Sequence, residues 1–314
     1  MADAILTVNH LNKSYGRQAV LRDVSFQCSQ GRIVGLVGAN GAGKTTIMKS
    51  ILGLLRTDGD IRIAGEPMKS DHHPILATVG ALIEYPSFYP YMSGWDNLRL
   101  FADDPDVKTR IATIVTALNM QAYIHQKARH YSLGMKQKLG IALAFLNQPQ
   151  LVILDEPMNG LDPQGTKELR DFILMQKQAG VTLLIASHIL SELQKLADDI
   201  VIIDHGKVIK KTTMAALLTT TEHFAIVTTN HDGQAKAALV AAGYQVVAGT
   251  VVKVHLTPDK QVADVLSVLT SHGLTVTDVQ HVDADLESTV LKLLTATSDE
   301  GGATHDETVS TRAH

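Results

Sequence analysis

The length, composition and charge of the chain exclude several classes of protein. Its 314 residues, 45% of them hydrophobic, are enough to build the cores of about two domains, so the chain as a whole is not disordered. The net charge of −4 lacks the cationic excess of a protein that coats nucleic acid. Residues 1–210 carry 22 basic and 20 acidic side chains, whereas residues 211–314 carry 6 and 12, which indicates two parts of different character.

The cysteine content and the apolar runs indicate the compartment. The single cysteine, Cys28, cannot form a disulfide within the chain, and no Cys/His cluster has the spacing of a zinc site, which favours a reducing environment. The longest apolar runs, such as 141–146 and 151–154, are far shorter than the roughly 18 residues that cross a bilayer. The N-terminus lacks a signal-peptide core. We therefore expect a cytoplasmic chain that reaches a membrane only through a partner.

The first elements in chain order are strands followed by a glycine-rich loop and a helix. Extended segments at 5–8 and 24–28, with a turn at Tyr15-Gly16, predict an opening β-sheet. Residues 33–37 form an apolar run of strand length. A glycine-rich stretch and a helix-compatible segment from Lys44 to about residue 55 follow it.

The middle of the chain predicts a helical subdomain and then an α/β sheet. Apolar side chains recur with helical spacing in 106–119 and again in 136–146, so residues 95–147 are predicted to be helical. Beyond them, the predicted strands are 151–154, 181–186 and 200–204, and the predicted helices are 166–178 and 190–197. Apolar strands that alternate with helices indicate a parallel sheet covered on both faces.

The pattern changes after Lys211. The segments 224–228, 234–242, 244–247, 251–256, 262–272, 274–279 and 286–294 read as strand, helix, strand, strand, helix, strand and helix. This order predicts a small α+β accessory domain of ferredoxin-like type over residues 211–295. Residues 296–314 have almost no large apolar side chain and are predicted to be a disordered tail.

A phosphate-binding motif lies between the apolar segment 33–37 and the helix after it. The residues are Gly38-Ala39-Asn40-Gly41-Ala42-Gly43-Lys44-Thr45, which match G-x-x-x-x-G-K-[ST]. Glycines let backbone N–H groups surround phosphates, and the helix N-terminus adds positive potential. Lys44 would reach the β- and γ-phosphates, and the Thr45 hydroxyl would bind Mg²⁺. The alternative, a glycine turn with a solvated lysine, does not explain the strand before the motif and the helix after it.

Two carboxylates follow the apolar segment 151–154. Asp155 and Glu156 would lie at the carboxyl end of a parallel strand, where such sheets bind ligands. Asp155 would hold the metal, usually through water, and Glu156 would act as general base on the attacking water. By itself this pair also fits a strand that simply meets solvent.

With these residues the chain resembles the nucleotide-binding subunit of an ATP-binding cassette (ABC) transporter. The segment Tyr131-Ser132-Leu133-Gly134-Met135-Lys136-Gln137 is similar to the family's signature, usually Leu-Ser-Gly-Gly-Gln, with Leu133 in place of the first paired glycine. The resemblance implies that Ser132 and Gly134 bind ATP held by the opposite subunit. Without the family, Ser132 also fits a helix N-cap.

Other segments stand where the family has further site residues. Asn159-Gly160-Leu161-Asp162 is at the place of the dimer-contact loop, and His188 is at the place of the switch histidine. The resemblance implies that His188 hydrogen-bonds the γ-phosphate, that Tyr15 stacks on adenine and that Thr46 contributes beside Thr45. On their own, His188 also fits a structural strand-end residue and Tyr15 a turn tyrosine.

One residue departs from the usual family pattern. Where the family has a glutamine before the helical subdomain, this chain reads Leu82-Ile83-Glu84-Tyr85-Pro86. The glutamate, the altered signature and the extra C-terminal domain resemble the bacitracin-type and lantibiotic-immunity exporters of bacteria. Glu84 then becomes a third candidate ligand of Mg²⁺, with Thr45 and Asp155. A surface glutamate without a role is the alternative.

The resemblance implies both a fold and a function. The expected fold is α/β, a P-loop ABC ATPase of residues 1–210 with a parallel-sheet core, an antiparallel β subdomain and a helical subdomain, plus the small α+β C-terminal domain. The expected function is Mg²⁺-dependent ATP hydrolysis by a homodimer whose signature acts in trans. Hydrolysis would drive a separate permease at the inner face of the membrane for export of a peptide antibiotic. Aromatic side chains concentrated in 84–100 fit a groove for that permease, or a local core.

Two other functions compete with this interpretation. The same ATPase would serve an exporter of lipid, ion or another small amphipathic cargo, because cargo contacts lie mainly in the permease. A soluble ABC protein that works on ribosomes or DNA would need two cassettes or a long coiled-coil insertion, and this chain has neither. Its acidic C-terminal third would also repel phosphate backbones, so no nucleic-acid partner is expected.

Overall fold

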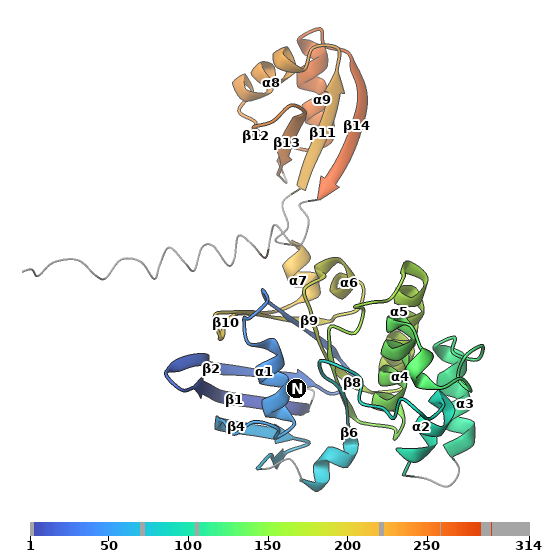
Figure 1. The fold of residues 1–314 in the computed structure, drawn as a ribbon. Coiled ribbons are helices and arrows are strands. Elements are labelled where there is room, and N and C mark those ends of the chain that lie inside the picture. Colours follow the sequence, from blue (N-terminus) through green and yellow to red (C-terminus); the bar gives the residue numbers. More distant parts are fainter. Residues whose placement is uncertain are drawn as a thin grey trace, which may run out of the picture. The chain divides into compact units, whose positions relative to one another are not determined.

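The chain forms two compact units, Met1–Met214 and Ala215–His314. The computed structural model describes residues 3–69, 73–103, 107–219, 223–257, 259–283 and 290 (Figure 1). The predicted tail, 296–314, lies outside the described residues. Of the predicted last helix, 286–294, only Val290 is described, as helical and buried.

An antiparallel sheet forms the β subdomain of the first unit. Its strands are β1 (Ala4–Tyr15), β2 (Gln18–Ser29), β4 (Asp58–Ile63) and β5 (Glu66–Pro67), in the order β2-β1-β4-β5. Buried and more exposed side chains alternate over residues 6–9 of β1 and 24–29 of β2, so Val8 and its cross-strand partner Phe26 are both buried. Cys28 lies in the same core, where burial raises the pKa of its thiol.

A six-stranded sheet forms the centre of this unit. Its strands are β3 (Ile33–Val37), β6 (Val79–Leu82), β7 (Leu151–Asp155), β8 (Thr182–Ser187), β9 (Asp199–Asp204) and β10 (Lys207–Thr213), in the order β10-β9-β3-β8-β7-β6. All neighbours are parallel except β9 and β10. β3, β7 and β8 are buried at every position, as expected for strands covered on both faces. Their carboxyl ends therefore lie side by side.

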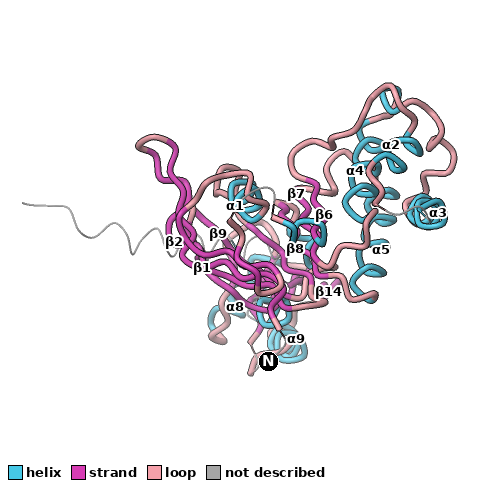
Figure 2. Tube along the Cα trace, turned by 90° about the horizontal axis from the view of Figure 1, so that it is seen from below, coloured by secondary structure: helices cyan, strands magenta, loops and turns pink. Residues whose placement is uncertain are grey.

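Helices complete the first unit. They are α1 (Lys44–Ile51), α2 (Gly94–Leu100), α3 (Val107–Ala117), α4 (Leu133–Phe145), α5 (Pro163–Gln178) and α6 (Leu190–Gln194). A further helix, α7 (Met214–Thr219), begins at the last residue of this unit and continues into the second. Figure 2 shows α2, α3 and α4 together, on the other side of β6–β8 from β1 and β2. The helical subdomain predicted for 95–147 corresponds to these three helices. The predicted boundary at residue 210 falls within β10, which continues to Thr213.

The second unit is a small α+β domain. Its elements are β11 (His223–Thr229), α8 (Asp232–Ala241), β12 (Val246–Val247), β13 (Val252–Leu256), α9 (Val262–Ser271) and β14 (Val276–Asp283). The strands form an antiparallel sheet in the order β12-β13-β11-β14, and residues of both helices share its core. The described elements from β11 to β14 therefore run strand, helix, strand, strand, helix and strand. The bounds predicted for this domain, 211–295, stay a prediction.

Candidate nucleotide-binding site

The glycine-rich loop joins the buried strand β3 to the first residue of α1. Gly41 and Gly43 have φ of 83° and 107°, in the left-handed region that glycine adopts without steric cost. A Cβ atom at Gly38 would collide with the carbonyl oxygen of Ile203. Lys44 is only 7% exposed, and its Nζ donates to the carbonyl oxygens of Gly38 and Ala39 at 2.7 and 3.2 Å. The positive charge of Lys44 is thus held at the loop. The other residues predicted to bind the nucleotide here are Asn40 and Ala42 in the loop and Thr46 in α1.

Two candidate metal ligands meet beside this loop. The Thr45 hydroxyl donates to Oδ2 of Asp155, the last residue of β7, at 2.6 Å. Mg²⁺ is usually bound by one or two such oxygen side chains together with water and substrate phosphates, and this pair fits that pattern. Among the described residues, no group of three or more His, Cys, Asp or Glu side chains is placed to hold a metal ion.

Glu84, the third candidate ligand, lies against α1. Its Oε1 accepts a hydrogen bond from Nζ of Lys49 at 2.7 Å, and its φ is 62°. Lys49 was not predicted as a functional residue. The sequence feature that could have indicated a role for Lys49 is its spacing: it lies four residues after Thr45 and therefore on the same side of α1. Ligation of a metal by Glu84 stays a prediction.

Glu156 and His188, which follow β7 and β8, form a pair. Oε2 of Glu156 lies 2.8 Å from Nδ1 of His188. The backbone N–H of Glu156 donates to the carbonyl of Ala186 at 2.9 Å, and its φ is 49°. This backbone region is uncommon for residues other than glycine and is often used at functional sites. The topology therefore brings together two residues that are 32 positions apart in the sequence.

A buried glutamine connects this turn to α4. The side-chain amide of Gln137 donates to the carbonyl of Pro157 at 3.1 Å. The sequence showed this residue within the signature segment but gave no sign of its contact. It fixes α4 against the residues that follow β7.

The signature segment starts α4 next to the loop 159–162. The Ser132 hydroxyl accepts the backbone N–H of Met135 at 3.2 Å, so this serine caps the helix. A Cβ atom at Gly134 would lie 2.9 Å from the carbonyl oxygen of Gly160, so the two segments are in close contact. Leu133 is 63% exposed at the start of the helix. The role of Ser132 and Gly134 toward ATP stays a prediction.

Tyr15 lies at the end of β1. Its ring is half-exposed, and Nζ of Lys13 is 5.1 Å from the ring centroid. One contact of the ring is therefore a cation–π contact. Stacking on adenine remains a prediction for this residue.

Ion pairs join α5 to α4, which the signature segment starts, and to α6, which follows His188. Lys138 on α4 binds Glu168 on α5 at 2.6 Å, and Arg170 on α5 binds Glu192 on α6 at 2.9 Å. The hydrogen bond from Lys195 is the main cause that lowers the pKa of the Glu192 carboxyl. Because α6 follows His188 closely, α5 links the signature helix to the histidine turn.

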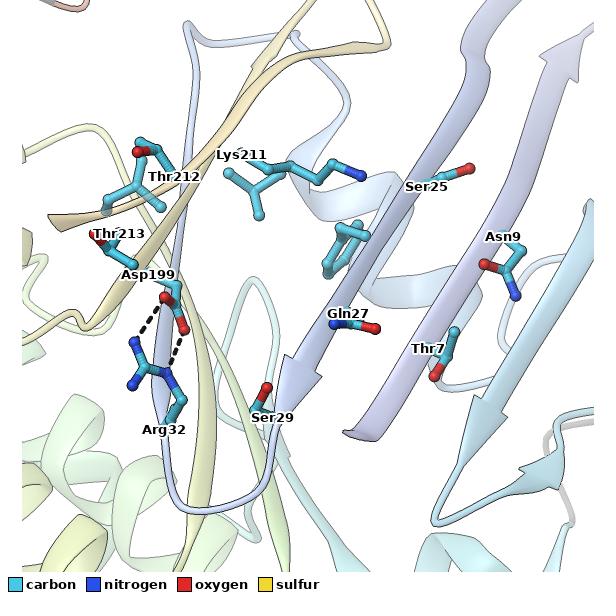
Figure 3. A pocket seen from close by; sticks show the side chains of 13 residues that line it. Thr7, Asn9, Ser25, Gln27, Ser29, Arg32, Asp199, Lys211, Thr212 and Thr213 are labelled. Carbon is cyan, nitrogen blue, oxygen red and sulfur yellow. Dashed lines mark hydrogen bonds and ion pairs between the residues drawn. The ribbon is translucent and has the colours of Figure 1, made fainter. Parts of the chain in front are cut away.

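A separate groove of about 790 Å³ lies between β1 and β2 on one side and β9 and β10 on the other (Figure 3). Arg32 and Asp199 line it and form a two-point ion pair, with N–O distances of 2.6 and 2.7 Å. This pair raises the pKa of the Arg32 guanidinium, chiefly through its hydrogen bond with Asp199. None of the candidate nucleotide-site residues lines this groove.

The phosphate loop on a parallel sheet, flanked by an antiparallel β subdomain and a helical subdomain with a capped signature helix, defines an ATP-binding cassette. A family model described as "ABC transporter" matches residues 21–159. The chain is 32% identical to the bacitracin transport ATP-binding protein BcrA of Enterococcus faecalis, over 92% of this chain and 96% of that protein. It is 40% identical to the lantibiotic transport ATP-binding protein SrtF of Streptococcus pyogenes, over 65% of this chain and 89% of that protein.

A solved structure of an ATP-binding subunit of an ABC transporter shares the fold. It is 33% identical to this chain, with a TM-score of 0.63, and the match covers 68% of this chain and 92% of that one. The chain therefore belongs to the ATP-binding proteins of ABC transporters, which confirms the predicted family and fold class. Within the described part of the chain, no helix has the length and apolarity needed to span a membrane.

Proposed function

We propose that this chain hydrolyses ATP with Mg²⁺ and so drives a separate membrane permease. The observation that supports hydrolysis most directly is the pair of contacts at neighbouring strand ends. Thr45 binds Asp155 next to the phosphate loop, and Glu156 binds His188 one residue further along. This arrangement combines a cation site, a carboxylate base and a polar ring around one loop.

In the proposed mechanism, backbone N–H groups of 38–44 surround the phosphates and Lys44 supplies positive charge. Thr45 and Asp155 would hold Mg²⁺, which when bound neutralises charge that develops on the phosphate oxygens. Glu156 accepts the proton of the attacking water. With Nδ1 engaged by Glu156, Nε2 is the atom of His188 left to face the phosphate.

We also propose that the active unit is a homodimer. Each chain carries one phosphate loop and one signature segment. Ser132 and Gly134 sit at the exposed start of α4, where backbone N–H groups favour an anion. In the proposed dimer these two residues complete the ATP site of the opposite subunit.

The permease would contact the exposed aromatic segment that follows Glu84, at the inner face of the membrane. Tyr85 and Tyr91 are 84% and 73% exposed, and Tyr89 stacks on Phe101 with ring centroids 6.0 Å apart. Exposed aromatic side chains on a folded surface favour a protein interface. This exposure supports the groove interpretation of the segment over a local core.

A peptide antibiotic is the cargo class that we propose. Two relatives are bacitracin and lantibiotic transport ATP-binding proteins, and the match to BcrA covers 92% of this chain. Cells that express this chain with its permease should tolerate higher concentrations of such a peptide. Tolerance to a lipid-like or ionic toxin instead would support one of the other cargo classes.

Replacing Glu156 with Gln tests the hydrolytic proposal. The variant should bind ATP with unchanged affinity while phosphate release falls about 10²- to 10⁴-fold, since the general base is lost. The matched control is Asp171→Asn, which removes an exposed carboxylate from α5. Phosphate release by Glu156→Gln near the parent rate would remove the general-base assignment.

A further inference from the structure

An ion pair next to the candidate metal ligands has no part in the mechanism above. Nζ of Lys49 on α1 and Oε1 of Glu84, just after β6, are 2.7 Å apart. Their side chains are 30% and 53% exposed. In the described part of the chain, the Glu84 carboxylate accepts its hydrogen bond from Lys49.

The geometry of α1 places this pair beside the Thr45–Asp155 contact. Thr45 and Lys49 are four residues apart, which corresponds to one helical turn and a rise of about 6 Å. Thr45 binds the carboxylate at the end of β7, and Lys49 binds the carboxylate that follows β6. Since β6 and β7 are adjacent parallel strands, both carboxylates face one side of one helix.

Carboxylates that face the same side of one helix favour a shared cation and repel each other without one. Lys49 supplies a fixed positive charge to one of them. Glu84 also holds a backbone conformation, φ of 62°, that a residue with a side chain adopts only when its surroundings favour it. The hydrogen bond from Lys49 is one contact that favours this backbone conformation, because it holds the Glu84 carboxylate against α1.

We propose that Lys49 is a positioning residue that competes with the divalent cation for the carboxylate of Glu84. While Lys49 holds it, Thr45 and Asp155 are the side-chain ligands offered to the metal. Once Lys49 is removed, Glu84 is free to add a third oxygen, and the cation binds more tightly. This inference rests on the proposed nucleotide site, and it assigns Lys49 control over how strongly that site retains its metal.

The test is a titration of Mn²⁺, followed by electron paramagnetic resonance, into the full chain saturated with a non-hydrolysable ATP analogue. Lys49→Met should lower the Mn²⁺ concentration at half-saturation about two- to fivefold, the range expected when a partly exposed ion pair is released. Lys49→Arg should keep the parent value, because it keeps the charge. In a Glu84→Gln background, Lys49→Met should have no effect.

The outcomes separate this proposal from the one it rests on. No analogue-dependent Mn²⁺ binding by the parent chain would refute the nucleotide site itself. Normal binding by the parent, with an unchanged or weakened value in Lys49→Met, would refute the role of Lys49. A shift that persists in the Glu84→Gln background would show that Lys49 acts without Glu84, and would refute the proposal too. If Lys49→Met does not fold, Lys49→Gln carries the same expectations.

Discussion

The phosphate loop can be tested by removing the charge of Lys44. In the structure its Nζ donates to two backbone carbonyls of the loop, at 2.7 and 3.2 Å, and the side chain is almost fully buried. Lys44→Ala should therefore lose a charge-assisted hydrogen bond to phosphate, worth about 1.5–3 kcal/mol. That energy corresponds to about a 10- to 150-fold weaker affinity for ATP.

Because Lys44 already donates to carbonyl oxygens of the loop, we expect the loss of ATP affinity in Lys44→Ala to lie toward the lower end of that range. On binding, the ammonium group exchanges bonds to neutral carbonyls for bonds to phosphate, so only the difference contributes to affinity. We expect a loss of about tenfold or more, measured by titration with a fluorescent ATP analogue at fixed ionic strength.

The matched control for this experiment is Lys207→Ala. It removes the same charge from an exposed position on β10. Unchanged ATP affinity in Lys44→Ala would refute the phosphate-loop assignment. An equal loss in the control would show that the effect comes from net charge rather than from a local contact.

Two further predictions concern the signature helix and the C-terminal unit. Gly134→Ala places a Cβ atom 2.9 Å from the carbonyl oxygen of Gly160, so denaturant unfolding should show a loss of about 1–3 kcal/mol and ATP hydrolysis should fall. The control is Gly233→Ala, which should be neutral or stabilising because no atom lies within 4 Å of the new Cβ. Equal effects of the two substitutions would contradict the close contact between Gly134 and Gly160. A chain that ends after Thr219 keeps every candidate site residue and the buried Met214, so it should remain folded and bind ATP. Insoluble protein, or loss of ATP binding, would show that residues 220–314 are needed for the first unit to fold.

Much of the site was predictable because its local conformations depend on neighbouring residues. The apolar run, the glycines and Lys44 specify a strand, a loop and a helix within a dozen positions. Ser132 was recognisable as a helix cap by its residue type and place. Element ends were less accurate, because tertiary contacts set them. The helix predicted to reach residue 55 ends at Ile51, and the strand predicted at 244–247 is only Val246–Val247.

The sequence by itself thus determined the family and the order of the motifs, and it indicates the chemistry that we propose for each motif. Only the tertiary structure decided which side chains meet. Glu84 and Lys49 are 35 residues apart, and neither carries a local signal for the other. The contact of Gln137 with Pro157 depends in the same way on how α4 packs near the end of β7. Such contacts follow from strand order and helix packing, which bring together residues far apart in the sequence, and local sequence patterns do not encode those distances.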